Sequence, residues 1–391
     1  MAVIVISGCA GVNTKDQLLV WTGMDEEDTL RKIASDFTAE TGINVKIVRF
    51  PFTELQPKFQ ISAPVGQGPD LLIGPHDWIG TLATAKLIKS VDLPAEDIRE
   101  FIPVTLKAMS FGGKLYGLPL SQEAICLIYN KKLVSTPPET MDELISKAVE
   151  LNKGDTAGFL FDICTFYYVS PFIYGFGGYV FKDTPSGLDP NDIGLDNNGA
   201  IDAINYLNDL IYKYKLVPKG TNKDIANGKF IDGQCAFTIN GPWTLVDFTK
   251  AKLDFGVAPI PKLSNGKYPQ PFVGVLGIIL NGKTKNEENA VKFMKHLCSK
   301  NGEVAIYSAG GRIPSRFDAL KDPLVAKDKE ITVFAQSANN GVPMPNIPEM
   351  TQVWPYMGAA LSLAETKKQS PKEALTEAVK MIREGIINMK E

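Results

Sequence analysis

The order of its apolar segments limits the fold of this chain more than any other feature, because short strand-like runs alternate with helical patterns. Residues 18–21 form a strand-like run, residues 30–37 carry apolar side chains at helical spacing, and residues 43–48 form a second run. Alternation of this kind predicts an α/β fold with a mostly parallel sheet. In such sheets ligands bind beyond the carboxyl ends of the strands. Residues 21–25 and 74–78 each lie at the end of a predicted strand, so both segments are candidates for a binding site.

The pattern restarts after residue 130, which indicates a second α/β unit. Two capping boxes predict helix starts, at Thr140 with Glu143 and at Ser370 with Glu373. The length of 391 residues also exceeds the size of one typical hydrophobic core, so two domains are expected. The other predicted elements include helices at about 78–87 and 198–214 and strands at 236–239, 255–258 and 272–280.

Composition and charge exclude several classes of function. The net charge of −3 gives no basic face for a nucleic acid. The only histidines are His76 and His296, and no CxxC pair is present, which speaks against a zinc site. The sequence also lacks a glycine-rich phosphate loop and a nucleophile motif, so we expect no catalytic residue, no metal and no cofactor. Four scattered cysteines are interpreted as small buried apolar side chains: Cys126, Cys164, Cys235 and Cys298.

The first residues have the pattern that ends a lipoprotein signal. A short apolar run at residues 2–7 leads to Gly8 and Cys9, but it is too short for a membrane span, which needs about 20 residues. It also lacks the basic start of a complete signal peptide. Two alternatives stay open: the precursor begins upstream and Cys9 is lipidated, or the segment is a buried strand. We favour the first, which predicts an extracytoplasmic protein that reaches the membrane only through a lipid anchor.

Several further segments are specific in combination. They are GPHDW at 74–78, Glu123 ahead of YNK at 129–131, FIYGFGGYVF at 172–181, NGPW at 240–243, PFVGV at 271–275, and MPNIPEM at 344–350 with Trp354 four residues on. In this order and spacing the chain resembles the maltose/maltodextrin-binding proteins that supply ABC importers, particularly those of thermophilic bacteria. The resemblance covers residues 17–391.

The resemblance implies a periplasmic-binding-protein-like fold, in which two α/β lobes with mixed sheets close over a ligand cleft. Crossover hinge strands near Ser121 and Val275 join the lobes. Carried over by position, residues 1–14 are a remnant lipoprotein signal and tether. The same comparison divides the remaining chain into lobe one, residues 15–121 plus 276–320, and lobe two, residues 122–275 plus 321–391.

The resemblance also implies a set of sugar-binding side chains. Asp77 and Glu123 match carboxylates that accept hydrogen bonds from sugar hydroxyls, and such charge-assisted bonds are about twice as strong as neutral ones. Tyr167, Trp243 and Trp354 match aromatic side chains that stack on the apolar faces of sugar rings.

The chain departs from the better-known maltose binders at several site positions. Trp78 stands where they have arginine, Thr165 and Phe166 replace a Glu-Pro pair, and Asp25 lies in an acidic segment where they have a basic residue. Aromatic contacts therefore replace charged ones, and the preferred sugar stays open among maltose, maltotriose, longer maltodextrins and trehalose. Two further residues align with ligand-lining positions, with a packing role as the alternative for each: Tyr168 and Met344.

The function implied by the resemblance is that of a non-enzymatic, substrate-binding component of an ABC importer. It is expected to be a monomer that closes around a malto-oligosaccharide and presents it to the permease subunits, with no nucleic-acid partner. Two alternatives stay open. Asp77 and Glu123 also permit a glycoside hydrolase that uses one carboxylate as acid and the other as nucleophile. A sensor that presents its sugar to a receptor would use the same closed clamp.

Overall fold

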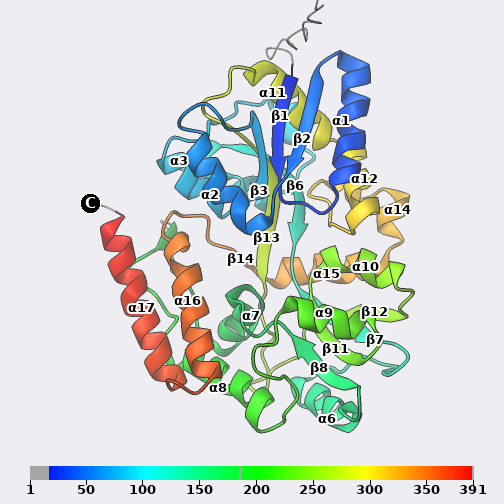
Figure 1. Ribbon diagram of the computed structural model, residues 1–391, viewed down its shortest axis with the longest axis vertical. Coiled ribbons are helices and arrows are strands. Elements are labelled where there is room, and N and C mark those ends of the chain that lie inside the picture. The colour runs from blue at the N-terminus through cyan, green and yellow to red at the C-terminus, as the bar shows by residue number, and fades with distance from the viewer. Residues whose placement is uncertain (1–16, 185–186, 390–391) are drawn as a thin grey trace, which may run out of the picture.

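The computed structural model describes residues 17–184 and 187–389, so the predicted signal and tether at 1–14, with Cys9, lie outside the described residues. The protein has the two-lobed α/β fold that the sequence predicted, with a separate sheet in each lobe. Figure 1 shows the two lobes one above the other. We call the lobe that contains the first strand lobe one and the other lobe two.

Lobe one is built on a mixed sheet of six strands: β1 (Gln17–Thr22), β2 (Asn44–Arg49), β3 (Leu71–Pro75), β6 (Gly117–Glu123), β13 (Phe272–Leu280) and β14 (Val342–Pro343). β1 pairs in parallel with β2 and β3, whereas β13 runs antiparallel to β3 and β6. The apolar runs predicted at 18–21, 43–48 and 272–280 are therefore confirmed as strands.

Helices cover both faces of this sheet. α1 (Glu27–Thr41), α11 (Glu287–Leu297) and α12 (Lys300–Gly310) pack on one face around Leu18 and Phe293. On the other face, α2 (Phe52–Ser62) and α3 (Trp78–Thr84) enclose a second cluster around Phe59. The helix expected to reach residue 87 ends at Thr84, and Lys86 beyond it has a left-handed φ of 57°. The short elements of this lobe are α4 (Ala95–Ile98), α5 (Pro103–Ala108), β4 (Ser110–Phe111), β5 (Lys114–Leu115) and α13 (Phe317–Leu320). The next helix, α14 (Pro323–Ala326), follows residue 320, the predicted end of lobe one, and contacts α12 and α13 as well as the later helix at 329–340.

Lobe two has a smaller sheet of four strands: β7 (Cys126–Asn130), β8 (Ala157–Phe161), β11 (Cys235–Asn240) and β12 (Phe255–Ala258). β7 is antiparallel to β11 and β12, and β8 is parallel to β11. The elements around this sheet are α6 (Met141–Leu151), α7 (Phe166–Phe176), β9 (Lys182–Thr184), β10 (Gly187–Asp189), α8 (Asn198–Tyr212), α9 (Lys223–Ile231), η1 (Pro242–Thr244), α10 (Leu245–Lys250), α15 (Lys329–Asn340), α16 (Met350–Glu365) and α17 (Pro371–Asn388).

Both predicted capping boxes are present. The hydroxyl of Thr140 accepts from the backbone N–H of Glu143 at the start of α6, and Ser370 does the same for Glu373 at the start of α17. Each box satisfies backbone donors that a helix leaves without an intrahelical partner. These helix starts are therefore fixed by local sequence, as expected.

The two predicted crossovers lie side by side. Ser121 in β6 pairs with Leu276 in β13, and Gln122 pairs with Val275. β6 leads directly toward β7 of lobe two, and Figure 1 shows β13 and β6 running between the lobes. The neighbouring antiparallel strands form a common joint for the two lobes.

A further passage between the lobes, which the sequence did not predict, lies between α15 and α16. Its strand β14 pairs with the start of β13. Just beyond, the amide of Asn346 donates to the backbone carbonyls of Ala108 and Ser110 in lobe one, at 3.0 and 2.8 Å. The chain therefore touches lobe one again before it returns to lobe two as α16.

Candidate functional site

Two predicted site residues from opposite lobes meet directly. The indole N–H of Trp354, in α16, donates a hydrogen bond of 3.3 Å to Oδ2 of Asp77, which lies at the start of α3. The two residues are 277 positions apart in the chain. Their contact therefore places the candidate site between the lobes.

The carboxylate of Asp77 has an unused acceptor. Its Oδ1 is buried and has no hydrogen-bond partner among the described residues. Burial raises the pKa of Asp77 to about 7, and the hydrogen bond from Trp354 only partly opposes this effect. A buried oxygen without a donor costs free energy, so a ligand hydroxyl that donates to Oδ1 would remove this penalty.

Aromatic rings of lobe two gather beside this contact. The ring centroid of Tyr167 lies 6.2 Å from that of Trp243 and 6.3 Å from that of Phe272, and Phe272 lies 6.3 Å from Trp354. Tyr167, Trp243 and Trp354 are each half-buried, so part of every ring is accessible. The three predicted stacking residues therefore form one group, which is the arrangement that apolar sugar faces require.

Tyr167 connects these rings to the acidic side chains. Burial, followed by the negative charge of Glu123 and smaller effects that include Asp77, raises the pKa of the Tyr167 hydroxyl well above its ordinary value. The hydroxyl is therefore neutral and able both to donate and to accept a hydrogen bond.

Glu123 lies at the end of β6 in an ion-pair network that the sequence did not predict. Arg312 pairs with Oε1 of Glu123, and its Nε donates to Oε1 of Glu26 at 2.7 Å. Burial raises the pKa of Glu123, while the positive charge of Arg312 lowers it. Nothing in the sequence indicated a role for Arg312, which follows two glycines in a segment without a recognisable motif.

The acidic segment at the end of β1 contributes Glu26 to this network. Asp25, the predicted site residue, instead points to solvent with 84% of its side chain exposed, where it pairs with Arg49. Glu26 has only 6% of its side chain exposed. The structure thus places Asp25 at the surface and the neighbouring Glu26 in the buried ion-pair network.

Three predicted residues at the start of α7 make packing contacts or hydrogen bonds within the protein. Phe166 is buried with its ring edge-on to Trp354, at 5.8 Å between centroids. Thr165 is exposed, and its hydroxyl donates to Asp162 at 2.9 Å. Tyr168 is buried, and its hydroxyl donates to Asn240 at 3.3 Å. These contacts hold the N-terminal turn of α7, from which Tyr167 projects beside Trp243.

Trp78 and Met344 are also buried, Trp78 in the core of lobe one and Met344 in the core of lobe two. Trp78 packs against Phe52, with ring centroids 5.6 Å apart. The backbone carbonyl of Met344 lies 2.9 Å from Nε2 of His76, while Val275 N–H donates to Nδ1 of His76 at 3.0 Å. Nδ1 therefore accepts and Nε2 donates, which requires a neutral ring, and burial lowers the pKa of His76 to about 4. His76, which directly precedes Asp77, thus links two interlobe segments through its ring, one at Val275 and the other at Met344.

Several other features of the described residues lie away from the predicted site. No group of three or more His, Cys, Asp and Glu side chains within residues 17–184 and 187–389 could hold a metal ion. A cavity of about 700 Å³ lies between α8 and the α16–α17 turn, and none of the predicted site residues lines it. No helix of the described residues is long and apolar enough to cross a membrane. The four cysteines at 126, 164, 235 and 298 are free, and all but the half-buried Cys164 are buried as expected.

Comparison with known proteins shows what kind of protein carries this arrangement. Residues 32–333 match the family described as bacterial extracellular solute-binding protein, which is most of the 391-residue chain. The chain belongs to this family. Members of the family are solute-binding proteins and not enzymes, so the glycoside hydrolase alternative is set aside.

This solute-binding protein has relatives that bind oligosaccharides. It is 30% identical to a galactooligosaccharide-binding protein of Bacillus subtilis, over 93% of this chain and 87% of the relative. It is 29% identical to a maltooligosaccharide ABC transporter solute-binding lipoprotein of Streptococcus pneumoniae, over 96% of this chain and 90% of the relative. The solved structure of the Thermus thermophilus maltotriose binding protein bound with maltotriose is similar at a TM-score of 0.89 and 39% identity, covering 94% of this chain and 100% of that one.

Proposed function

We propose that this solute-binding protein captures a neutral malto-oligosaccharide of about three glucose units between its lobes and presents it to the permease subunits of an ABC importer. The observation that carries the proposal is the meeting of Asp77 with Trp354 beside the half-buried ring of Tyr167. An unused carboxylate oxygen suits a sugar hydroxyl, and the neighbouring rings suit the apolar face of the same sugar.

The ligand is proposed to act as the link that favours lobe closure. Asp77 belongs to the proposed lobe one, at 15–121 plus 276–320, whereas Trp354 belongs to the proposed lobe two, at 122–275 plus 321–391. A sugar that contacts both side chains binds more tightly to the closed form than to an open one, and this difference in affinity shifts the population toward closure. The antiparallel joint of β6 and β13 is where such a hinge motion would occur.

We expect maltotriose to bind with a dissociation constant near micromolar or tighter, about −8 kcal/mol or better, and to remain uncleaved. Isothermal titration calorimetry gives the affinity, solution scattering at saturating sugar gives the decrease in radius of gyration, and chromatography of the recovered sugar tests for turnover. Galactotriose is the matched control, because one relative is a galactooligosaccharide binder. Tighter binding of galactotriose than of maltotriose, or release of shorter sugars, would contradict the proposal.

We also propose that the mature protein is held at the outer face of the membrane through lipid on Cys9. The family is extracellular, and the pneumococcal relative is a lipoprotein. In cells that express the native precursor, wild-type protein should sediment with membranes, whereas Cys9→Ser protein should be released or remain unprocessed. Cys164→Ser is the control, since this half-buried cysteine of lobe two has no part in anchoring. Wild-type protein found wholly in the soluble fraction would argue against the anchor.

A further inference from the structure

Arg312 bridges two carboxylates from distant parts of the chain. It lies 286 positions after Glu26 and 189 after Glu123 in sequence, and it hydrogen-bonds to Oε1 of each. All three side chains are largely buried, with exposed fractions of 11%, 6% and 17% for Arg312, Glu26 and Glu123. Breaking a buried ion pair leaves an uncompensated charge, so the position of each carboxylate depends on the arginine.

The bridge leaves acceptor capacity free beside the proposed ligand site. Oε2 of Glu26 is buried and without a hydrogen-bond partner in the described part of the chain. Glu123 lies next to Gly274, close to Tyr167: a Cβ built on Gly274 would be 3.7 Å from Glu123 Cβ and 3.8 Å from Tyr167 Oη. Glu123 therefore adjoins the aromatic group of lobe two, and Arg312 connects Glu26 to Glu123.

The two glycines before Arg312 allow a close fit between the lobes. A Cβ on Gly310 would lie 1.9 Å from Oε1 of Glu26, so no larger residue leaves room for this carboxylate. Gly311 has a left-handed φ of 67°, and its Cβ would be 3.1 Å from the carbonyl oxygen of Pro242, directly before Trp243. The loop thus reaches the network in lobe one and the edge of the aromatic group in lobe two.

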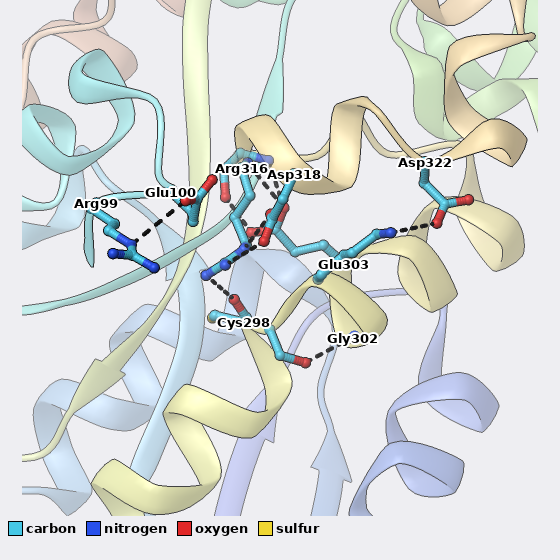
Figure 2. Close-up of polar contacts among 11 residues, drawn as sticks. Arg99, Glu100, Cys298, Gly302, Glu303, Arg316, Asp318 and Asp322 are labelled. Carbon is cyan, nitrogen blue, oxygen red and sulfur yellow. Dashed lines mark hydrogen bonds and ion pairs between the residues drawn. The ribbon is translucent and has the colours of Figure 1, made fainter. Parts of the chain in front are cut away.

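The segment after Arg312 is fixed to lobe one. Gln122 N–H donates to the carbonyl of Ile313 at 2.9 Å. The carboxylate of Glu303 accepts from the backbone N–H groups of Ser315 and Arg316, at 2.9 and 3.1 Å. Figure 2 shows Glu303 beside Arg316 in this anchor. A guanidinium held by such an anchored backbone is preorganised, which favours a positioning role.

We propose that Arg312 is a positioning residue of the ligand site, which fixes the carboxylates of Glu26 and Glu123 as hydrogen-bond acceptors for the hydroxyls of a neutral oligosaccharide. The inference rests on the proposed function and adds Glu26 and Arg312 to its site. Arg312 acts through the carboxylates, so its contribution to affinity depends on their presence.

A comparison of one substitution in two backgrounds tests this dependence. In the wild-type background, Arg312→Gln should weaken maltotriose binding at least tenfold. In a protein that already carries Glu26→Gln and Glu123→Gln, the same substitution should change affinity less than threefold. Arg312→Lys keeps the charge but not the two-pronged geometry, so its affinity for maltotriose should lie between those of wild type and Arg312→Gln. It also provides a milder variant if Arg312→Gln does not fold. Arg316→Gln is the control: its side chain pairs with Asp318 in the same anchored segment, and it should leave affinity unchanged.

The outcomes separate this inference from the proposed function. Failure of wild-type protein to bind maltotriose in the same calorimeter would overturn the proposed function and, with it, the inference. Normal wild-type binding with an equal loss in both backgrounds would show that Arg312 does not act through the carboxylates. Unchanged affinity together with a lower melting temperature would make Arg312 a purely structural residue and would overturn the inference alone.

Discussion

Trp354→Ala is expected to weaken maltotriose binding by about 2 kcal/mol or more, roughly thirtyfold. The indole contributes a half-buried ring beside Phe272 and a hydrogen bond to Asp77, and both lie where the ligand is proposed to bind. Aromatic anchors dominate binding when they are rigid and partly desolvated. The thermal midpoint should change little, because the ring is not enclosed on all sides. Calorimetry and thermal unfolding of the same preparation measure the two effects.

Trp21→Ala is the matched control for this prediction. Trp21 is 7% exposed at the end of β1 and packs edge-on against Phe50, with centroids 4.8 Å apart. Its loss should lower the free energy of unfolding by about 3–5 kcal/mol and leave the affinity of the folded protein near the wild-type value. The reverse result, with Trp354→Ala protein melting early but binding normally, would show that Trp354 is a packing residue.

Glu303→Ala is expected to lower the free energy of unfolding by about 3 kcal/mol. Glu303 is 1% exposed, and its carboxylate accepts from Ser315 Oγ at 2.5 Å and from two backbone N–H groups. Truncation leaves these donors unpaired and opens a cavity in the segment drawn in Figure 2. Urea unfolding followed by circular dichroism measures the loss.

Glu303→Gln is the near-isosteric control and should stay within about 1 kcal/mol of wild type. The oxygen of its side-chain amide can accept from the backbone N–H groups of Ser315 and Arg316, and its NH2 group can donate to the Ser315 hydroxyl. Burial raises the pKa of Glu303 well above its ordinary value, so between the ordinary and the raised pKa the folded protein binds more protons than the unfolded chain. Wild-type stability should therefore fall as pH rises through the raised pKa, and Glu303→Gln should remove this part of the slope. Equal losses for both variants would show that the bonds to Ser315 and Arg316 contribute nothing.

Local signals in the sequence were sufficient for much of the fold. The run at 272–280 became a strand that is buried along its whole length, because its side chains have no polar face to keep in water. The boxes at Thr140 and Ser370 became helix starts because a hydroxyl and a glutamate three residues apart satisfy backbone donors without help from the rest of the chain. The prediction extended the helix that begins at Trp78 too far, to residue 87. The sequence around its actual end, Thr84, carries none of the usual stop signals.

The strand ends in the sequence marked the segments that contain Asp25 and Asp77, whereas the individual sugar-binding side chains followed only from the resemblance. Asp77, Tyr167, Trp243 and Trp354 are brought together across the lobes, whereas Asp25 lies in solvent. Periodicity cannot separate such residues, because a half-buried ring and a core ring have the same sequence pattern.

The amino-acid sequence by itself determined the strands, the capped helices and the family. Only the tertiary structure decided which charges meet. Glu26, Glu123 and Arg312 form one buried network because β1, β6 and the loop after α12 end at the same place in lobe one. Arg312 lies 286 positions after Glu26 and 189 positions after Glu123, and no local sequence pattern links residues that are so far apart. The energy of an ion pair depends on the distance between the two charges. That distance is set by the path of the whole chain through both lobes.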